Sequence, residues 1–421
     1  MGANQSIIDP SSSFKRLIAA VNSGDVTTIN DVLQANPCHL KASAAVGPFA
    51  SHGSGFLHLA AQRGKASSVL ALCNFVENCD VENFQIFAHH FEKRSNLSKP
   101  FESVGDRRKD LLKHFVNAAN RKGQTALIYA CYYGNSEVVN ALLERGADVF
   151  SQDRCGGRCA LHYAALRGSA ACVRVLLNYV KQNNIDPPVD VSSNELEARR
   201  YVDVRSMCGV QPLHLAAAKG HLEATRELLA FRPRVAAPLP PSAYLDCTSQ
   251  PFNNWSTPLH IAAQKGHVDV AMEIMTACIY HMQLEGRWAP SEELGNDTDA
   301  EPPSTDTGSG ISTFFSADLR RCVDGEKFFP SQIAGMYGHP ELAEALLPSR
   351  SISQFVELYG LDLAGMAERV RGTGITLPID DSAAAKRVGV ATAKRQARLA
   401  LIARLEELKR VLAVDEEGEG G

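Results

Sequence analysis

Four histidines recur in one short phrase, and histidine is the side chain best suited to proton transfer near neutral pH. His58, His162, His214 and His260 each follow a leucine directly and stand one residue before an Ala-Ala pair. A catalytic histidine is needed once, whereas a structural histidine recurs with its repeating unit. The pattern therefore favours hydrogen bonding across a turn over general acid–base or nucleophilic chemistry.

The remaining residues that could do chemistry lack the necessary spacing. The eleven cysteines include no Cys-x-x-Cys pair, and the closest two, Cys155 and Cys159, have three residues between them. That pattern is typical of reduced thiols in the cytosol rather than of a disulfide framework or a zinc site. The sequence contains no phosphate-binding loop, no Gly-x-Ser-x-Gly elbow and no His-Glu-x-x-His motif. We therefore expect no catalytic residue, metal or cofactor. An enzyme with its site in 78–118 or in the C-terminal tail is the more distant alternative.

The histidine phrase belongs to an internal repeat that occurs seven times. Each copy runs from an anchor leucine, or a serine in the last copy, to a glycine seven residues later. The copies are "LIAAVNSG" at 17–24, "LHLAAQRG" at 57–64, "LIYACYYG" at 127–134, "LHYAALRG" at 161–168, "LHLAAAKG" at 213–220, "LHIAAQKG" at 259–266 and "SQIAGMYG" at 331–338. A second stretch with helical apolar periodicity follows each glycine.

Each copy predicts a helix–turn–helix unit. Thr125 and Thr257 precede the first helix as N-caps, Pro212 and Pro258 occupy the first helical position, and the glycine ends the helix. The unit resembles the ankyrin repeat, whose signature is T-P-L-H-x-A at a period of about 33 residues. The predicted fold class is all-α: an ankyrin-repeat solenoid, elongated from about 11 to 347, with at least six helix pairs, loop insertions and a C-terminal helical tail.

The spacing between copies defines the expected domains. Only copies three and four lie one repeat apart, at 34 residues, so the other intervals contain insertions. Residues 78–118 include helix-compatible stretches and are either elaborated structure or a degenerate repeat. The expected domains are an N-terminal segment at 1–10, repeats with insertions at 11–280, an acidic disordered insertion at 281–327, a degenerate terminal repeat at 328–347 and a helical tail with an acidic end at 348–421. Within the insertion, 289–312 is almost without apolar residues, and we expect it to be disordered.

The C-terminal tail contains a basic stretch at 383–414 that is compatible with one amphipathic helix. Such a helix can bind a membrane or a partner. The favoured alternative is a capping helix that packs on the last repeat and leaves its charges in solvent.

The N-terminal "MGANQS" fits the Met-Gly-x-x-x-Ser pattern of N-myristoylation, with Gly2 as the acceptor. One myristate gives only weak membrane binding, so we expect a cytoplasmic protein, with a peripheral position at the inner face of a membrane as the alternative. No apolar stretch approaches the roughly 18 residues of a membrane span. The net charge of −4 does not indicate a nucleic-acid partner.

The stretch at 121–180 resembles the central repeats of the plant ankyrin–RING ubiquitin ligases, which also tend to begin with a myristoylation pattern. The resemblance implies a role in ubiquitination, but a RING domain needs eight Cys/His ligands in spaced pairs. After residue 280 the sequence offers only Cys322, His281 and His339. These residues do not provide a RING, so a ubiquitination role would be that of a substrate or adaptor subunit.

The predicted function is a protein–protein interaction scaffold that binds a partner of unknown identity through the concave face of the repeat array. The alternative is a RING-less substrate or adaptor subunit of a ubiquitin-ligase system. Helical geometry places the residues five and six positions after each anchor opposite the buried leucine and alanines. Aromatic and arginine side chains are the usual interface anchors. The partner-binding residues predicted from these positions are Tyr132, Tyr133, Arg167, Lys219 and Lys265.

Overall fold

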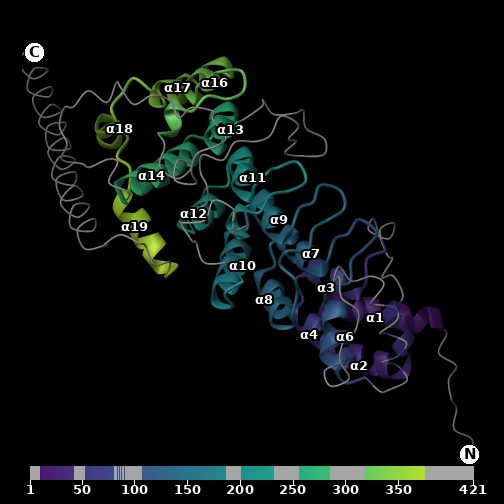
Figure 1. Ribbon diagram of the computed structural model, residues 1–421. Coiled ribbons are helices and arrows are strands. Elements are labelled where there is room, and N and C mark those ends of the chain that lie inside the picture. The colour runs from purple at the N-terminus through teal and green to yellow at the C-terminus, as the bar shows by residue number, and fades with distance from the viewer. Residues whose placement is uncertain are drawn as a thin grey trace, which may run out of the picture. The chain divides into compact units, whose positions relative to one another are not determined.

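A computed structural model describes residues 10–41, 53–79, 107–185, 201–231, 256–284 and 318–374, with four further positions between 83 and 90. Apart from one bridge residue, Ala118, every regular element of these residues is helical (Figure 1), so the predicted all-α class is confirmed. The chain divides into two compact units, the first running through Leu228 and the second including the residues from Asn253 onward.

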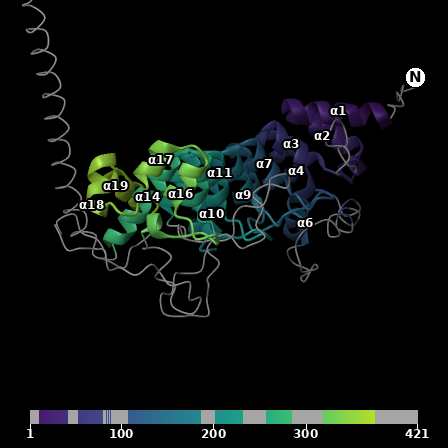
Figure 2. The same ribbon diagram turned by 90° about the horizontal axis from the view of Figure 1, so that it is seen from above.

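The first unit consists of helix pairs stacked side by side. The pairs are α1 (Pro10–Ser23) with α2 (Val26–Ala35), α3 (Phe56–Arg63) with α4 (Ala66–Glu77), α7 (Ala126–Tyr133) with α8 (Ser136–Glu144), α9 (Ala160–Arg167) with α10 (Ala170–Gln182), and α11 (Pro212–Lys219) with α12 (Leu222–Ala230). We call α1, α3, α7, α9 and α11 the first-row helices, because each packs on the next in that order. The second-row helices are α2, α4, α8, α10 and α12. Figures 1 and 2 show the first-row helices α3, α7, α9 and α11 following one another.

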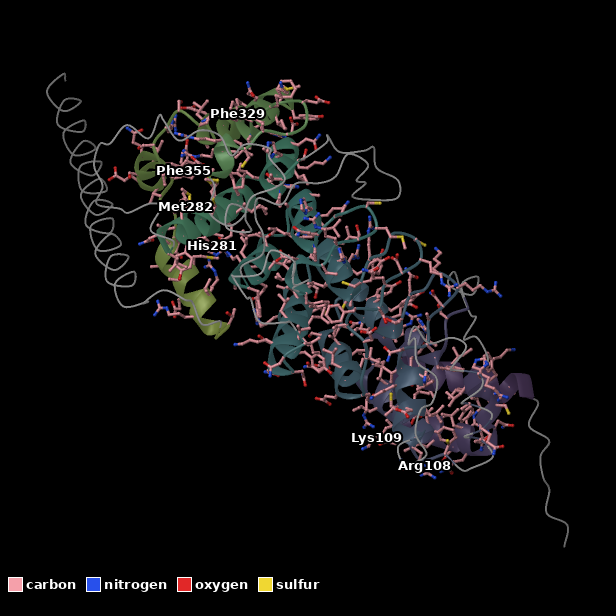
Figure 3. All side chains as sticks on the ribbon, viewed as in Figure 1. Arg108, Lys109, His281, Met282, Phe329 and Phe355 are labelled. Atoms are coloured by element: carbon pink, nitrogen blue, oxygen red, sulfur yellow. The ribbon has the colours of Figure 1, made fainter. Side chains whose placement is uncertain are left out.

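The second unit continues the repeat pattern. It contains α13 (Pro258–Lys265), α14 (Val268–Leu284), η5 (Leu319–Arg321), α16 (Pro330–Met336), α17 (Pro340–Ala345), α18 (Ile352–Tyr359) and α19 (Leu363–Gly372). The worn last copy forms the pair α16 and α17, which packs on α13, while α19 packs on α14. Figure 3 labels His281 and Met282 on α14 and Phe355 on α18, and all three side chains are buried. With seven helix pairs from α1 to α17, the prediction of at least six is confirmed.

The ends of the first-row helices and of α13 follow the sequence signals with one exception. Thr125 caps α7 by accepting a hydrogen bond from the Ile128 N–H, and Pro212 and Pro258 occupy the first turns of α11 and α13. Thr257 does not cap α13 through its side chain. Its hydroxyl instead lies 2.8 Å from Nδ1 of His260, the third residue of the helix.

The glycines that end α3 and α9 also leave room for the next repeat. Gly168 has φ +72, in the left-handed region, and a Cβ built there would lie 2.6 Å from the His221 ring. The Nε2–H of that ring donates to the Leu166 carbonyl oxygen at 3.1 Å. The corresponding Cβ at Gly64 would lie 2.8 Å from the Asn135 side chain, which donates to the Ala61 carbonyl at 2.7 Å. The glycines therefore end the helices and admit a polar side chain from the neighbouring pair.

Parts of the expected insertions are ordered. Within 78–118, α6 (Arg107–Val116) forms a helix that packs on α4, beside the second row. Within 281–327, α14 extends through Leu284, and η5 follows at Leu319–Arg321. Both elements are ordered because they contribute buried side chains to the second unit. Residues 1–9, 289–312 and 383–414 lie outside the described residues, and the expectations for them remain predictions. No helix among the described residues is long and apolar enough to cross a membrane.

Candidate partner-binding surface

The recurrent histidines connect one repeat to the next. In each, Nδ1 accepts a hydrogen bond from the backbone N–H three residues earlier, at 3.1 Å for Gly55 and His58, 3.3 Å for Cys159 and His162, 3.3 Å for Gln211 and His214, and 3.2 Å for Thr257 and His260. In His58, His162 and His260 the other ring nitrogen donates to a backbone carbonyl of the following repeat. These distances are 2.8 Å for His58 and Gln124, 2.9 Å for His162 and Val210, and 3.2 Å for His260 and Phe328.

Burial keeps His162 and His260 neutral. His162 and His260 are 0% and 1% exposed, and burial lowers the pKa of each to about 4. Both ring nitrogens of His162 already have partners, so the side chain offers no free base to a substrate. The structural interpretation of the recurrent histidines is confirmed.

Sequence reasoning missed the turns that precede the first-row helices. The Asp153 carboxylate accepts backbone N–H groups from Cys155 and Gly156 and also the Tyr163 hydroxyl. Asn120 does the same before α7: its oxygen accepts two backbone N–H groups, and its amide donates to the Tyr129 hydroxyl at 3.1 Å. Each of these residues stands three positions before a glycine. That spacing is typical of an Asx turn and was the available signal.

The structure brings together three of the five predicted partner-binding residues. The Tyr132 and Tyr133 rings meet edge to face with their centroids 5.1 Å apart. The Arg167 guanidinium lies over the Tyr132 ring, 4.8 Å from its centroid. Tyr132 is 36% exposed, and Arg167 is exposed as well. We call Tyr132, Tyr133 and Arg167 the tyrosine–arginine patch.

The patch continues onto α3. Gln62 donates to the Tyr133 hydroxyl at 3.4 Å, and partial burial raises the pKa of Tyr133. A phenol with a raised pKa remains a neutral hydrogen-bond donor. The patch is therefore a surface of two phenol side chains and one guanidinium, suited to binding rather than to proton transfer.

The two predicted lysines lie on other helices than the tyrosine–arginine patch. Lys219 is exposed at the end of α11, which packs on α9, the helix that bears Arg167. Lys265 is exposed at the end of α13 and belongs to the second unit. Among the described residues, no group of three His, Cys, Asp or Glu side chains could hold a metal ion.

Comparison with known proteins identifies the repeats. The family model described as "Ankyrin repeats (3 copies)" matches residues 104–189 and 191–283. The chain is similar to the probable E3 ubiquitin-protein ligase XBOS32 of Oryza sativa subsp. japonica, with 36% identity over 27% of this chain and 25% of the relative. It is also similar to the E3 ubiquitin-protein ligase XBAT33 of Arabidopsis thaliana, with 29% identity over 54% of this chain and 38% of the relative. The resemblance expected from 121–180 is confirmed.

These matches span about a quarter to two fifths of the length of the relatives. Among solved structures, the human ASB11 ankyrin repeat domain aligns over 80% of this chain and 99% of that chain, at 16% identity and a TM-score of 0.41.

Proposed function

We propose that this chain, whose repeats match the ankyrin family model, is a scaffold that binds a partner protein on the tyrosine–arginine patch. Stacked ankyrin repeats present extended surfaces for protein–protein interaction, and the repeat fold binds rather than catalyses. The observation that supports the patch is the stacking of Arg167 on Tyr132, since it holds an arginine and two tyrosines at the surface in a fixed arrangement. These residue types dominate the binding energy of interfaces.

The double substitution Tyr133→Ala with Arg167→Ala tests this proposal. We expect it to weaken partner binding by about 2 kcal/mol or more, because interface anchors of these types carry that much. The partner is first captured with the full chain from its native cells and identified by mass spectrometry. Its affinity for both forms of the chain is then measured by calorimetry, with the thermal midpoint of each as a check on folding.

Arg108→Ala with Lys109→Ala is the matched control. Both side chains are exposed on α6, which packs on the second-row helix α4 (Figure 3). We expect this control to bind the partner as the unaltered chain does. An unchanged affinity in the Tyr133/Arg167 variant, with its fold intact, would show that the partner binds elsewhere.

A second candidate function follows from the relatives, two of which are named as ubiquitin ligases. In this alternative the chain is a substrate or adaptor subunit of a ubiquitin-ligase system. Capture from native cells would then recover a RING-bearing protein. Addition of the chain would increase ubiquitin transfer to a second captured protein. If the capture recovers no ubiquitin-pathway component, this alternative is rejected and the scaffold function is retained.

We also propose N-myristoylation at Gly2, which supports weak membrane association of an otherwise cytoplasmic protein. The motif at residues 1–6 supports this proposal. We expect the intact mass of protein from its native cells to include one myristoyl group, and Gly2→Ala to shift the chain toward the soluble fraction. An unmodified or acetylated Gly2 would contradict it.

A further inference from the structure

Charge is divided unequally between the two rows of helices in the first unit. The first-row helices α1, α3, α7, α9 and α11 contain no aspartate or glutamate but carry five lysines and arginines. The second-row helices include Glu77 on α4, two glutamates on α8 and two on α12. The side of the unit formed by the first row is therefore basic.

The basic side chains of the first row occupy equivalent positions. Arg63, Arg167 and Lys219 are each the last residue of their helix, six positions after the anchor leucine, and Tyr133 holds that position on α7. Because α3, α7, α9 and α11 stack in this order, these residues form a line across the first unit. Arg63 and Arg167 both act electrostatically on the Tyr133 hydroxyl, as expected for cations on either side of it. We call Arg63, Arg167 and Lys219 the cation row.

The cation row is held in place without being neutralised. Arg63 donates to the Asn22 side chain at 3.1 Å, and Arg167 stacks on Tyr132. In the part of the chain that the structure describes, none of the three cations forms an ion pair.

Arginines of the second row and its caps differ in this respect. Their pairs are Arg145 with Glu77 at 2.9 Å, Arg226 with Glu223 at 2.8 Å, and Arg174 with Glu227. The chain thus neutralises its second-row arginines internally and leaves the cation row available to a partner.

We propose that the cation row binds an extended acidic segment of the partner protein, with its carboxylates opposite Arg63, Arg167 and Lys219. This proposal rests on the scaffold function and specifies the chemistry of its partner. Guanidinium groups bind carboxylates in a bidentate manner, with hydrogen bonds stronger than those between neutral groups. The Tyr132 and Tyr133 rings lie within the row and offer aromatic contact between the carboxylates. Complementary charge also steers association and selects against basic partners.

An acidic peptide fits this surface better than a nucleic acid. Proteins that bind a duplex typically neutralise about six to ten phosphates, whereas the cation row offers three charges. The second-row carboxylates and the net charge of −4 would also repel a polyanion that extends beyond the row.

The test uses the full chain and a fluorescein-labelled 20-residue oligo-glutamate, with a Gly-Ser peptide of the same length as the neutral probe. We expect fluorescence polarisation to show oligo-glutamate binding that weakens with added salt, and no binding of the Gly-Ser peptide. The triple variant Arg63→Gln, Arg167→Gln, Lys219→Gln should weaken binding by about tenfold or more, since it removes three charge-assisted contacts. The triple variant Arg108→Gln, Lys109→Gln, Lys113→Gln on α6 makes the same change in net charge on exposed side chains. It should alter the affinity by less than about twofold.

Three outcomes would overturn the acidic-segment proposal: no binding of oligo-glutamate, equal losses in the two triple variants, or equally tight binding of a 20-nucleotide oligouridylate lost in the cation-row variant. The last outcome would assign the row to nucleic acid. Failure of the tyrosine–arginine patch as the binding site is recognised separately, because in that case the captured partner binds the Tyr133/Arg167 variant normally. If the captured partner no longer binds that variant and the unaltered chain does not bind oligo-glutamate, the scaffold function stands and only the acidic-segment proposal is rejected.

Discussion

Replacement of His162 by alanine is expected to lower the free energy of unfolding by about 3 kcal/mol. The change leaves the Cys159 N–H and the Val210 carbonyl without their histidine partner in a buried site, and each buried unsatisfied group costs about 1–3 kcal/mol. It also opens a cavity where the ring packs. Urea denaturation of the full chain, followed by circular dichroism, measures the loss. His221→Ala is the control, since His221 is half-buried and bonds the Leu166 carbonyl alone, so we expect it to lose less than half as much.

The same histidine predicts a pH dependence. Its folded pKa of about 4 lies below the ordinary value of 6.5, so the neutral form contributes stability that is complete above pH 6.5. This contribution is lost as the pH falls through about 4, and His260 adds a loss over the same range. We expect the unaltered chain to lose stability steeply between pH 6.5 and 4, and His162→Ala to lose it less steeply. Parallel pH profiles would contradict the role assigned to the buried neutral ring.

The sequence was sufficient to predict the helix pairs and the structural role of the histidines. Both predictions depend on local signals that repeat with the unit: the Leu-to-Gly spacing, the buried Ala-Ala pair and the residue at each cap. The expected exposure of Tyr132 and Arg167 also followed from one helical period, because their positions face away from the buried anchors. Thr257 occupies the N-cap position of α13, but its side chain accepts no backbone N–H of the helix, because its hydroxyl and its backbone N–H both contact Nδ1 of His260, three residues later.

The contacts between repeats could not be predicted in this way. The carbonyl partners of His58, His162 and His260 lie 66, 48 and 68 residues later in the chain. These separations vary because insertions lie between the repeats, yet each chain segment returns to the same hydrogen bond. The stacking of Arg167 on Tyr132 likewise joins two helices, and its geometry depends on rotamers that a sequence pattern does not specify. The charge difference between the rows became visible only when the helices were assigned to rows.

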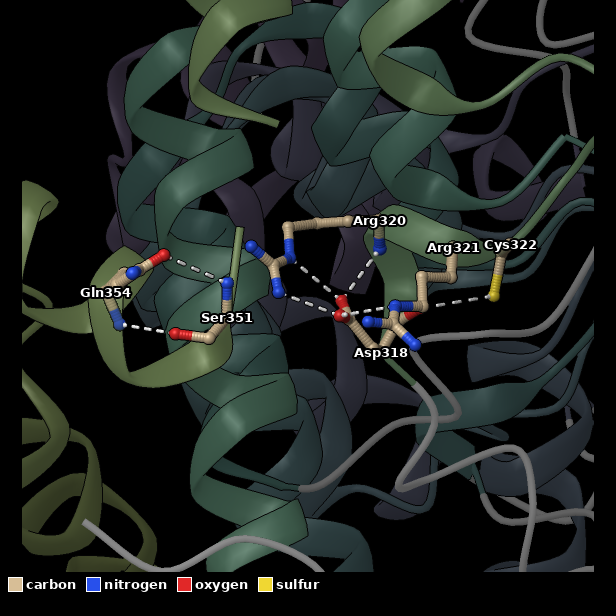
Figure 4. Close-up of polar contacts among 6 residues, drawn as sticks. All are labelled: Asp318, Arg320, Arg321, Cys322, Ser351 and Gln354. Atoms are coloured by element: carbon tan, nitrogen blue, oxygen red, sulfur yellow. Dashed lines mark hydrogen bonds and ion pairs between the residues drawn. The ribbon is translucent and has the colours of Figure 1, made fainter. Parts of the chain in front are cut away.

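The sequence also contains no indication that Arg320 is a buried charged residue. Arg320 lies within the segment 281–327, whose composition predicted disorder, but its side chain is fully buried. Its guanidinium donates to the Asp318 carboxylate at 3.0 and 2.8 Å (Figure 4) and lies 4.8 Å from the centre of the Phe355 ring. A single arginine and aspartate two residues apart give no periodic signal. The pair becomes structural only through the tertiary contact of Arg320 with Phe355 on α18.

Arg320→Leu is therefore expected to destabilise the second unit by about 3–5 kcal/mol. The substitution leaves the Asp318 carboxylate, with a side chain only 10% exposed, without its main counter-ion. Removal of one partner of a buried ion pair typically has this effect, because an uncompensated charge remains in a poorly solvated site. The loss of the guanidinium over Phe355 adds to it. Urea denaturation of the full chain gives the change in stability, and hydrogen exchange at α18 locates it in the second unit.

Two variants separate this charge effect from simple loss of packing. Arg321 is more exposed and lies 3.8 Å from the same carboxylate, so Arg321→Leu should cost less than about 1 kcal/mol, as for a surface ion pair. Adding Asp318→Asn to Arg320→Leu removes the stranded charge and should restore part of the lost stability. The asparagine oxygen can still accept the Arg320 backbone N–H that Asp318 binds at 3.1 Å. If the double variant is no more stable than Arg320→Leu alone, the loss arises from packing against Phe355 and not from the buried carboxylate.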